Sequence, residues 1–302
     1  MALKDIKAKI QATQRTHKVT RAMEAVSAVK MRKTQQVAIA GRPYARAALS
    51  ILTRLSGTED VKRHPLAQHR DGKKLALVLI TSDKGLAGSL NSAVLKRAVT
   101  ALEGRDPKEV TIFAYGRKGE EHFKRRGYAI AWTRENKSDD IPLSVMQELS
   151  EKLSASFLAG EYDKVITVYS HFASTFEQVP TLRRLLPLSL PALKDIVDGI
   201  TPAKGKWSHE PSLKAPVAYE LEPSGEELLD LLIPRLIAIA MYHMLLEAKA
   251  SEHSARMVAM KNASDKSKEV THDLRRLFNK LRQAAITREV SEIVSGREAL
   301  AS

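Results

Sequence analysis

The chain has 302 residues and carries 49 Lys and Arg against 35 Asp and Glu, a formal net charge of +14. So basic a chain is expected to meet an acidic partner, which can be nucleic acid, anionic lipid or an acidic protein surface. Cysteine is absent and aromatic residues make up 5%, which excludes disulfides, thiolate metal sites and cysteine nucleophiles and leaves few platforms for base stacking.

The first 56 residues favour one long helix. Ala, Lys, Gln, Met and Arg dominate, and only Gly41 and Pro43 interrupt them before Ser56. Small apolar residues recur at intervals of 3, 4 and 3, which predicts a narrow coiled-coil seam formed by Val19, Ala22, Val26 and Val29. A similar stripe, one register away, contains Ile6, Ile10 and Thr13. A helix of about 50 residues would span roughly 75–80 Å.

The middle of the chain alternates between strand and helix patterns. Short runs of branched apolar residues predict strands at 75–81, 110–115, 128–132 and 164–170, and one or two edge strands within 175–188. Helical patterns lie between them at 89–103, after Gly116 and at 143–158. This alternation predicts a Rossmann-like α/β domain at 74–195 with a parallel or mostly parallel sheet.

A second long helix is expected at 223–302. The polar stretch 194–216 is predicted to be a long loop, and residues 196–222 are expected to form the loop or foot region between the two domains. Ser224 and Glu227 have the spacing of a capping box, and Pro234 is expected to kink the helix near its start. Further along, an apolar stripe at intervals of 4, 3, 4 and 3 resembles the N-terminal seam and comprises Val270, Leu274, Leu277, Leu281 and Ala284.

Neither terminal helix can bury its stripe against a domain of about 120 residues, whose diameter is only about 30 Å. The two ends are therefore expected to pair as an antiparallel coiled coil with the α/β domain inserted between them.

Residues 1–46 hold eleven Lys and Arg but only Asp5 and Glu24, a net charge of +9. A solvated helix face is one explanation. The shortage of carboxylates for pairing within the helix favours a partner surface instead.

Motifs for catalysis are missing from the sequence. It contains no Walker-type phosphate loop, no G-x-S-x-G and no metal-ligand spacing among its nine histidines. One loop, from Ser82 to Asn91, follows a predicted strand and opens a helix, where phosphate can bind. Its two glycines, Gly85 and Gly88, also fit an ordinary strand-to-helix turn, with Ser89 or Asn91 near the cap. The sequence therefore offers no recognisable motif for catalysis, for a cofactor or for a metal.

Three stretches together resemble the γ subunit of rotary F-type ATP synthases. The first runs from Lys18 to Lys33 and is similar to the family's opening K-[IV]-T-x-A-M pattern. The third runs from Ala250 to Gly296 and contains R-Q-A-A-I-T-R-E-V-S-E-I-V-S-G, which resembles the family's C-terminal signature. The second matches the family's S-D-[KR]-G-L-[CA]-G…N motif through Ser82, Asp83, Lys84, Gly85, Gly88 and Asn91. Asp265-Lys266-Ser267 departs from the family's usual Asp-Asn-Ala, and Arg297-Glu298 replaces small residues.

The resemblance implies a central-stalk rotor without nucleotide, cofactor or metal sites of its own. Its coiled coil would stand inside a ring of α and β subunits, and its α/β domain would lie beside the ε subunit on the membrane-embedded c-ring. Proton-driven rotation of the c-ring would then change the conformations of the catalytic β subunits for ATP synthesis. Carried over by position, the residues expected to contact β are Met23, Lys30, Lys33, Arg282, Gln283 and Thr287, and Glu222 would lie near the c-ring.

Simpler roles compete with this interpretation. Met23 can pack within the seam, and Thr287 can cap or fill its own helix. The whole chain can also be a basic coiled-coil protein that binds nucleic acid, or an enzyme that uses the α/β insert.

The start of the chain bears on its location. The family motif starts within about 20 residues of Met1, which leaves no room for a transit peptide. No apolar run of 18 residues predicts a membrane span. We therefore expect a peripheral protein on the cytoplasmic face of a bacterial inner membrane, with a processed organellar chain as the alternative.

Overall fold

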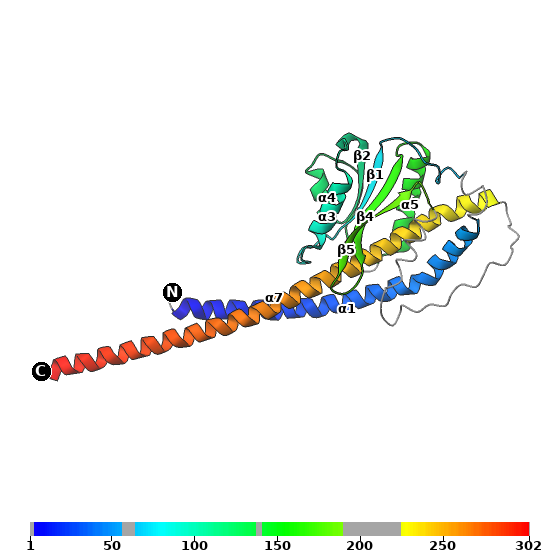
Figure 1. Cartoon of the computed structure of the whole chain (residues 1–302). Coiled ribbons are helices and arrows are strands. Elements are labelled where there is room, and N and C mark those ends of the chain that lie inside the picture. The colour runs from blue at the N-terminus through cyan, green and yellow to red at the C-terminus, as the bar shows by residue number, and fades with distance from the viewer. Residues whose placement is uncertain (1–2, 56–63, 137–140, 190–224, 302) are drawn as a thin grey trace. The chain divides into compact units, whose positions relative to one another are not determined.

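Two long helices begin and end the chain. The computed structural model describes residues 3–55, 64–136, 141–189 and 225–301. Helix α1 spans Leu3–Leu55 with 53 residues, and α7 spans Gly225–Ala301 with 77 residues (Figure 1). Both long terminal helices are thus confirmed, and Pro234 lies inside α7. The loop expected at 194–216, Glu222 in the foot region and the capping Ser224 lie outside the described residues.

The segment between the two helices forms a five-stranded sheet in the order β3-β2-β1-β4-β5. The strands are β1 (Leu75–Ile80), β2 (Val110–Tyr115), β3 (Ala129–Arg134), β4 (Lys164–Phe172) and β5 (Gln178–Leu186). The first four run parallel, and β5 pairs antiparallel with β4 at the edge. The predicted strands are confirmed to within about two residues at most ends, and the edge segment forms a single strand.

Helices cover both faces of this sheet. Alternate residues of β1 point to opposite faces, so Ala76, Val78 and Ile80 join one core and Leu75, Leu77 and Leu79 the other. The first core is completed by α5 (Leu143–Leu158) and by apolar residues of α7 between Ile233 and Ala248. The second is completed by α3 (Leu90–Ala101) and α4 (Arg117–Lys124), as Figure 1 shows; the 3-10 turn η1 (Pro107–Glu109) precedes β2. Burial on both faces explains why β1 is apolar throughout.

The strand order reverses between β1 and β4. From β1 the chain moves outward through α3 to β2 and through α4 to β3, and then returns through α5 to β4 on the other side of β1. In doubly wound sheets, the crevice at the carboxyl ends of the strands beside such a reversal is where ligands bind. The family-motif loop from Ser82 to Asn91 starts at this point.

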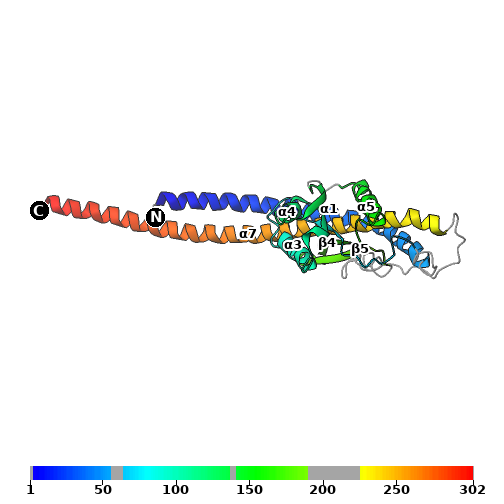
Figure 2. The same ribbon diagram turned by 90° about the horizontal axis from the view of Figure 1, so that it is seen from above.

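The chain separates into two compact units. One consists of Met1–Ser27 with Met257–Ser302, and the other of Ala28–Arg256, so each long helix contributes to both. The division at 1–56, 74–195, 196–222 and 223–302 that the sequence suggests stays a prediction. In the first unit, α1 and α7 lie side by side and run antiparallel, and the ring Nδ1 of His17 lies 3.0 Å from the Ser264 carbonyl oxygen (Figure 2).

The contact face of α1 differs from the predicted seam. Val19, Val26 and Val29 are 57%, 55% and 67% exposed, and Ala22 is exposed as well. The face that is covered follows the other stripe, which begins at Ile6 and Ile10 and continues through Thr13, His17, Thr20, Ser27, Met31 and Thr34. The two stripes share a heptad spacing and differ in register, and the more apolar one faces outward.

Small hydroxyl residues form this seam because their own helix satisfies their hydrogen bonds. The Thr20 hydroxyl donates to the Thr16 carbonyl at 3.0 Å, and the Thr34 hydroxyl donates to the Lys30 carbonyl at 3.0 Å. On α7, Ser267 and Thr271 do the same toward residues 263 and 267. A hydroxyl bonded in this way can be buried at low cost, and its small volume lets two helices approach closely.

Only part of the predicted C-terminal stripe on α7 is covered. Val270, Leu274 and Leu281 are half-buried, whereas Leu277 and Ala284 are exposed. The covered face instead contains Ser264, Ser267, Thr271 and, half-buried, Phe278. Again the polar members of the seam are those that an apolar pattern does not detect.

Candidate partner-contact sites and the loop after β1

The family-motif loop is anchored by its first and last residues. Ser82 and Asp83 are buried at the end of β1, whereas Lys84, Gly85 and Leu86 are exposed. The Ser82 backbone N–H donates to Asn91 Oδ1 at 3.1 Å, and Asn91 Nδ2 donates to Ser82 Oγ at 2.8 Å. The loop is therefore closed by its own side chains across the start of α3.

The Asp83 side chain binds the N-terminus of the neighbouring helix α4. Its Oδ1 accepts a hydrogen bond of 2.8 Å from the Arg117 backbone N–H at the beginning of α4. A carboxylate at this place satisfies an unpaired helix N–H and complements the helix dipole. Ser89 occupies the N-cap position of α3, close to where the sequence places the cap, but its side chain makes no capping hydrogen bond. Asn91 turns back to Ser82 instead.

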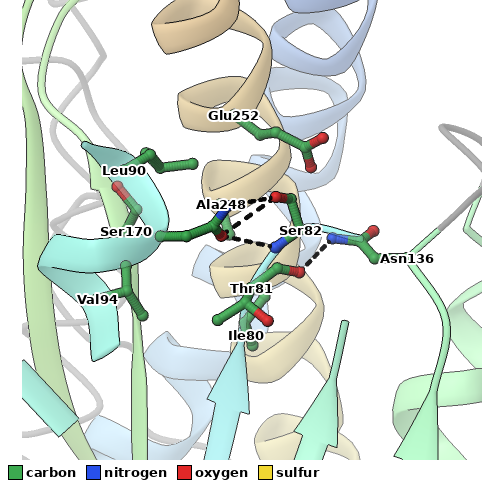
Figure 3. A pocket seen from close by; sticks show the side chains of 10 residues that line it. Ile80, Thr81, Ser82, Leu90, Val94, Asn136, Ser170, Ala248 and Glu252 are labelled. Atoms are coloured by element: carbon green, nitrogen blue, oxygen red, sulfur yellow. Dashed lines mark hydrogen bonds between the residues drawn. The ribbon is translucent and has the colours of Figure 1, made fainter. Parts of the chain in front are cut away.

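Helix α7 fills the crevice at the strand reversal. Figure 3 shows Ala248 and Glu252 of α7 facing Thr81, Ser82, Asn136 and Ser170, around a small hollow. The hollow is lined by Ile80, Thr81, Ser82, Leu90, Asn91, Val94, Asn136, Ser170, Ala248 and Glu252. The place where a related fold would hold a ligand is thus occupied by a helix of the same chain. This arrangement supports the ordinary-turn interpretation of the motif loop over phosphate binding.

Three charged side chains of α7 point into this region. Lys249 is 1% exposed, and its Nζ donates to the Asn136 carbonyl oxygen at 2.9 Å. Glu252 and Arg256 are also buried, and Arg256 Nη2 lies 2.8 Å from Glu252 Oε1 and 3.3 Å from the Gly85 carbonyl oxygen. Sequence reasoning did not assign these residues. Their spacing of 3 and 4 is the signal that places them on one face of the helix.

A histidine–carboxylate pair lies on the same side of α7. His171 Nδ1 of β4 is 2.8 Å from Glu247 Oε2, and both side chains are largely buried. The hydrogen bond to Glu247 raises the pKa of His171 above its usual value, and burial opposes this effect. Burial is also the main cause that raises the pKa of the neighbouring Tyr169, with a further contribution from Glu247.

The residues expected to contact β all lie on the long helices. Lys30 and Lys33 of α1 and Arg282, Gln283 and Thr287 of α7 are exposed, and Met23 is half-buried. The Thr287 hydroxyl donates to the Gln283 carbonyl at 3.0 Å, which agrees with a local role for that side chain. Arg282 and Gln283 are neighbours in the distal unit. Glu222 lies outside the described residues.

By composition and length alone, one stretch of α7 is apolar enough to cross a membrane, although it is interrupted by charged residues. Of this window, 67% is buried inside the protein. Its apolar residues, such as Ile237, Met241 and Leu245, belong to the core between α7 and the sheet. The apolar character of the stretch is therefore explained by packing within the chain.

Among the described residues, no group of three His, Cys, Asp or Glu could hold a metal ion.

Comparison with known proteins identifies relatives over the whole chain. The family model described as ATP synthase matches residues 2–300. The chain is 37% identical to the ATP synthase gamma chain of Pelotomaculum thermopropionicum, covering 99% of both chains. It is 40% identical to that of Roseiflexus castenholzii, covering 99% of this chain and 98% of the relative. These matches include the three stretches on which the resemblance rests.

Solved structures agree in fold. A chain of the central stalk and c-ring structure of the Tetrahymena thermophila mitochondrial ATP synthase superposes with a TM-score of 0.59 at 26% identity, covering 82% of this chain and 99% of that one. A chain of the Euglena gracilis mitochondrial ATP synthase superposes with a TM-score of 0.65 at 17% identity, covering 99% and 94%. None of these comparisons supports nucleic-acid binding. Sequence, fold and family motifs agree, and the chain belongs to the family of ATP synthase γ chains, the non-catalytic subunits of the central stalk.

Proposed function

We propose that this chain is the central-stalk rotor of a bacterial F-type ATP synthase. In this role it turns with the c-ring, driven by proton flow, and changes the conformations of the catalytic β subunits so that ATP is made and released. The observation that carries the proposal is the match of family motifs and relatives over nearly the whole chain. The basic, partly apolar outer face of α1 supports it, because such a face suits a protein partner with carboxylates.

The partners follow from the family. The α and β subunits would surround the coiled coil, and ε and the c-ring would meet the other end. On α1, Lys30 and Lys33 are exposed cations, and Met23 lies half-buried about two to three turns before them. These three would face an acidic segment of β. Glu222 would contribute to the foot on the c-ring, and the complex would place the chain at the cytoplasmic face of the inner membrane.

The distal end of α7 supports a rotation-dependent contact with β. Because His17 lies beside Ser264 in an antiparallel pair, Leu3 lies opposite about residue 278. Residues beyond that point have no partner from α1 within the described part of the chain. Arg282 and Gln283 lie side by side on this segment and are exposed. Arg offers a planar fork suited to carboxylates, and Gln offers both a donor and an acceptor.

The test is Arg282→Ala in complexes assembled with α, β, ε and the c-ring. Removal of a charge-assisted hydrogen bond worth roughly 1.5–3 kcal/mol in one orientation should lower multi-site ATP hydrolysis and ATP-driven proton pumping while assembly stays normal. Lys at this position should restore part of the activity, because an ammonium group cannot make the two-pronged contact. Arg276→Ala, which removes another exposed Arg from the same helix, is the matched control.

Two results would contradict parts of this proposal. If both rates of a normally assembled Arg282→Ala complex stay within about twofold of the wild type, which is less than 1 kcal/mol, the side chain is only part of the bearing surface. If the wild-type chain fails to copurify with α and β and instead binds random DNA in a salt-dependent manner, the rotor proposal itself is wrong.

A further inference from the structure

We propose that the buried charged face of α7, formed by Lys249, Glu252 and Arg256, is a clamp that transmits torque between this helix and the α/β domain. The three residues act as positioning residues, which hold the two parts in one rotational orientation. The inference rests on the proposed rotor function and goes beyond it, because it states which contacts carry the load within the chain.

The clamp joins α7 to the ends of three strands. Lys249 binds the carbonyl of Asn136, which follows β3, and Arg256 binds the carbonyl of Gly85, which follows β1. The Ser251 hydroxyl donates to the Ser170 carbonyl of β4 at 3.1 Å, and the Ser254 hydroxyl donates to the Thr175 carbonyl after β4 at 2.5 Å. All four acceptors are backbone oxygens, so the helix is fastened to the frame of the sheet and not to flexible side chains.

Asn136 extends the clamp across the sheet. Its carbonyl accepts from Lys249, and its Nδ2 donates to the Thr81 carbonyl oxygen at 2.8 Å (Figure 3). A single buried residue thereby connects β3, the end of β1 and α7. Attachment points that lie apart on different strands resist rotation of the helix about its own axis, which one contact cannot do.

The apolar contacts beside the clamp resist turning less specifically. There α7 presents to the core both large side chains, such as Met241 and Leu245, and small ones, Ala240 and Ala248. Apolar burial is non-directional and opposes separation of the surfaces more than sliding or turning. Hydrogen bonds from buried charged groups are directional, because they weaken steeply when the angle changes.

The charge of the clamp is costly to bury, which points to a role in orientation. Lys249, Glu252 and Arg256 are at most 8% exposed. Buried ionic groups of this kind are often no more stabilising than apolar residues of equal volume, whereas they can fix one arrangement among several. A smooth apolar interface would hold the helix against the sheet but would allow it to twist under load.

The experiment uses the full chain in assembled synthase, with Lys249→Met as the main variant. Met nearly keeps the volume and removes both the charge and the bond to Asn136. We expect assembly to stay normal while proton pumping per ATP hydrolysed falls. We also expect backbone amides of residues 244–256 to exchange about ten- to hundredfold faster in the complex, as after the loss of one charge-assisted hydrogen bond. Exchange in α3 should remain unchanged.

A matched control lies within the α/β domain. Lys152 Nζ also donates to a backbone carbonyl, that of Ala131 at 3.3 Å, but this bond joins α5 to β3 and does not reach α7. Lys152→Met should leave pumping per ATP and exchange of residues 244–256 as in the wild type. Torsional stiffness gives a direct readout: with the α and β ring immobilised, a bead on the α/β domain should show larger angular fluctuations for Lys249→Met only.

The outcomes separate this inference from the proposed function. A wild-type complex that neither assembles nor pumps would contradict the rotor function itself. A wild-type complex that pumps, together with a Lys249→Met complex that matches it in coupling, exchange and stiffness, would overturn the clamp alone. If Lys249→Met fails to assemble, Arg256→Lys keeps a charge beside Glu252 and shortens the reach to Gly85. Unchanged exchange of residues 244–256 in that variant would equally overturn the clamp.

Discussion

His171 and Glu247 join β4 to α7 through one hydrogen-bonded pair with an Nδ1–Oε2 distance of 2.8 Å. The charge of Arg183 lowers the pKa of both His171 and Tyr169 and so opposes the effect of Glu247. The pair gives α7 a contact with the sheet through a titratable imidazole, since the ordinary pKa of a histidine is 6.5.

This pair predicts a pH dependence of stability. The pKa of His171 is raised in the folded chain, so the native state binds the proton more tightly than the unfolded state. Its contribution is fully present below the ordinary value of 6.5 and is lost as pH rises through the raised value. His171→Gln should therefore lower stability by about 1 kcal/mol or less at pH 6 and flatten this part of the profile.

The measurement is the urea midpoint of the chain as a function of pH. His69→Gln is the control, because His69 is an exposed histidine that lies 3.4 Å from the exposed Asp71. Its profile should match that of the wild type. A His171→Gln profile as steep as that of the wild type above pH 6.5 would show that the pair with Glu247 contributes no pH dependence.

Met23 offers a second test at a single residue. It is half-buried on α1, close to the covered face at Thr20 and Ser27. Met23→Lys would extend an ammonium group from an already basic face toward an acidic partner and could add an ion pair worth about 1 kcal/mol when partly desolvated. The ion pair would lower the free energy of one rotational orientation and raise the barrier to leaving it. Assembled complexes should therefore pump fewer protons per ATP. Met23→Leu should behave as the wild type, and unchanged pumping by the Lys variant would assign Met23 to packing alone.

Among the elements, the junction of β2 and α4 depends on a glycine. Gly116 has a φ of 106°, and a Cβ atom added there would lie 2.0 Å from the Thr81 carbonyl oxygen. The close approach lets the Thr81 N–H donate to the Tyr115 carbonyl at 2.8 Å, so the ends of β1 and β2 stay paired beside the loop. Only glycine combines this φ with this contact.

Gly116→Ala should therefore destabilise the α/β domain by more than about 3 kcal/mol, through left-handed strain together with overpacking. Gly104 is the matched control, because its φ of 76° is also positive but nothing lies within 4 Å of an added Cβ. Gly104→Ala should cost only about 1–2 kcal/mol. Fluorescence of Trp132, in chains that carry Trp207→Phe, reports urea unfolding of the domain. Equal losses for the two variants would mean that the contact with Thr81 is easily relieved.

Secondary-structure elements differ in how well the sequence predicts them. The strands were found because runs such as Leu75–Ile80 are apolar at every position, a pattern with few other uses in so short a segment. The seam of α1 was placed on the wrong stripe because apolar periodicity favours Val19 and Val26, whereas the covered residues include Thr20 and Ser27. Their burial depends on hydroxyl bonds within the helix, which no pattern of hydrophobicity reports.

The long-range part of the site was beyond sequence reasoning for a different reason. Spacing places Lys249, Glu252 and Arg256 on one helix face, but it does not tell which strand ends that face meets. The contacts to Gly85 and Asn136 span 171 and 113 residues of sequence. Only the strand order β3-β2-β1-β4 brings the ends of β1, β3 and β4 to one edge and so creates the surface that α7 covers.

For the whole molecule, the balance of exposed apolar surface and charge decides how the isolated chain behaves. The outer face of α1 exposes Val19, Val26 and Val29, and the distal segment of α7 exposes Ile286, Val290, Ile293 and Val294. Apolar patches of this kind on a single chain mark surfaces that partners cover. The net charge of +14 acts against self-association, because copies of the chain repel one another.

These two effects predict an unusual salt dependence. Salt shortens the range of charge repulsion to about 10 Å at 0.1 M and about 3 Å at 1 M, while apolar attraction is not weakened. The purified chain should therefore remain helical, bind a hydrophobic dye and form larger species as salt increases, as measured by light scattering. Ile286→Gln together with Ile293→Gln should reduce both dye binding and the growth with salt, whereas Lys152→Met should change neither. If the larger species instead dissolve as salt increases, they are held by charge, as in complexes with nucleic acid, and the exposed apolar residues are not the cause of association.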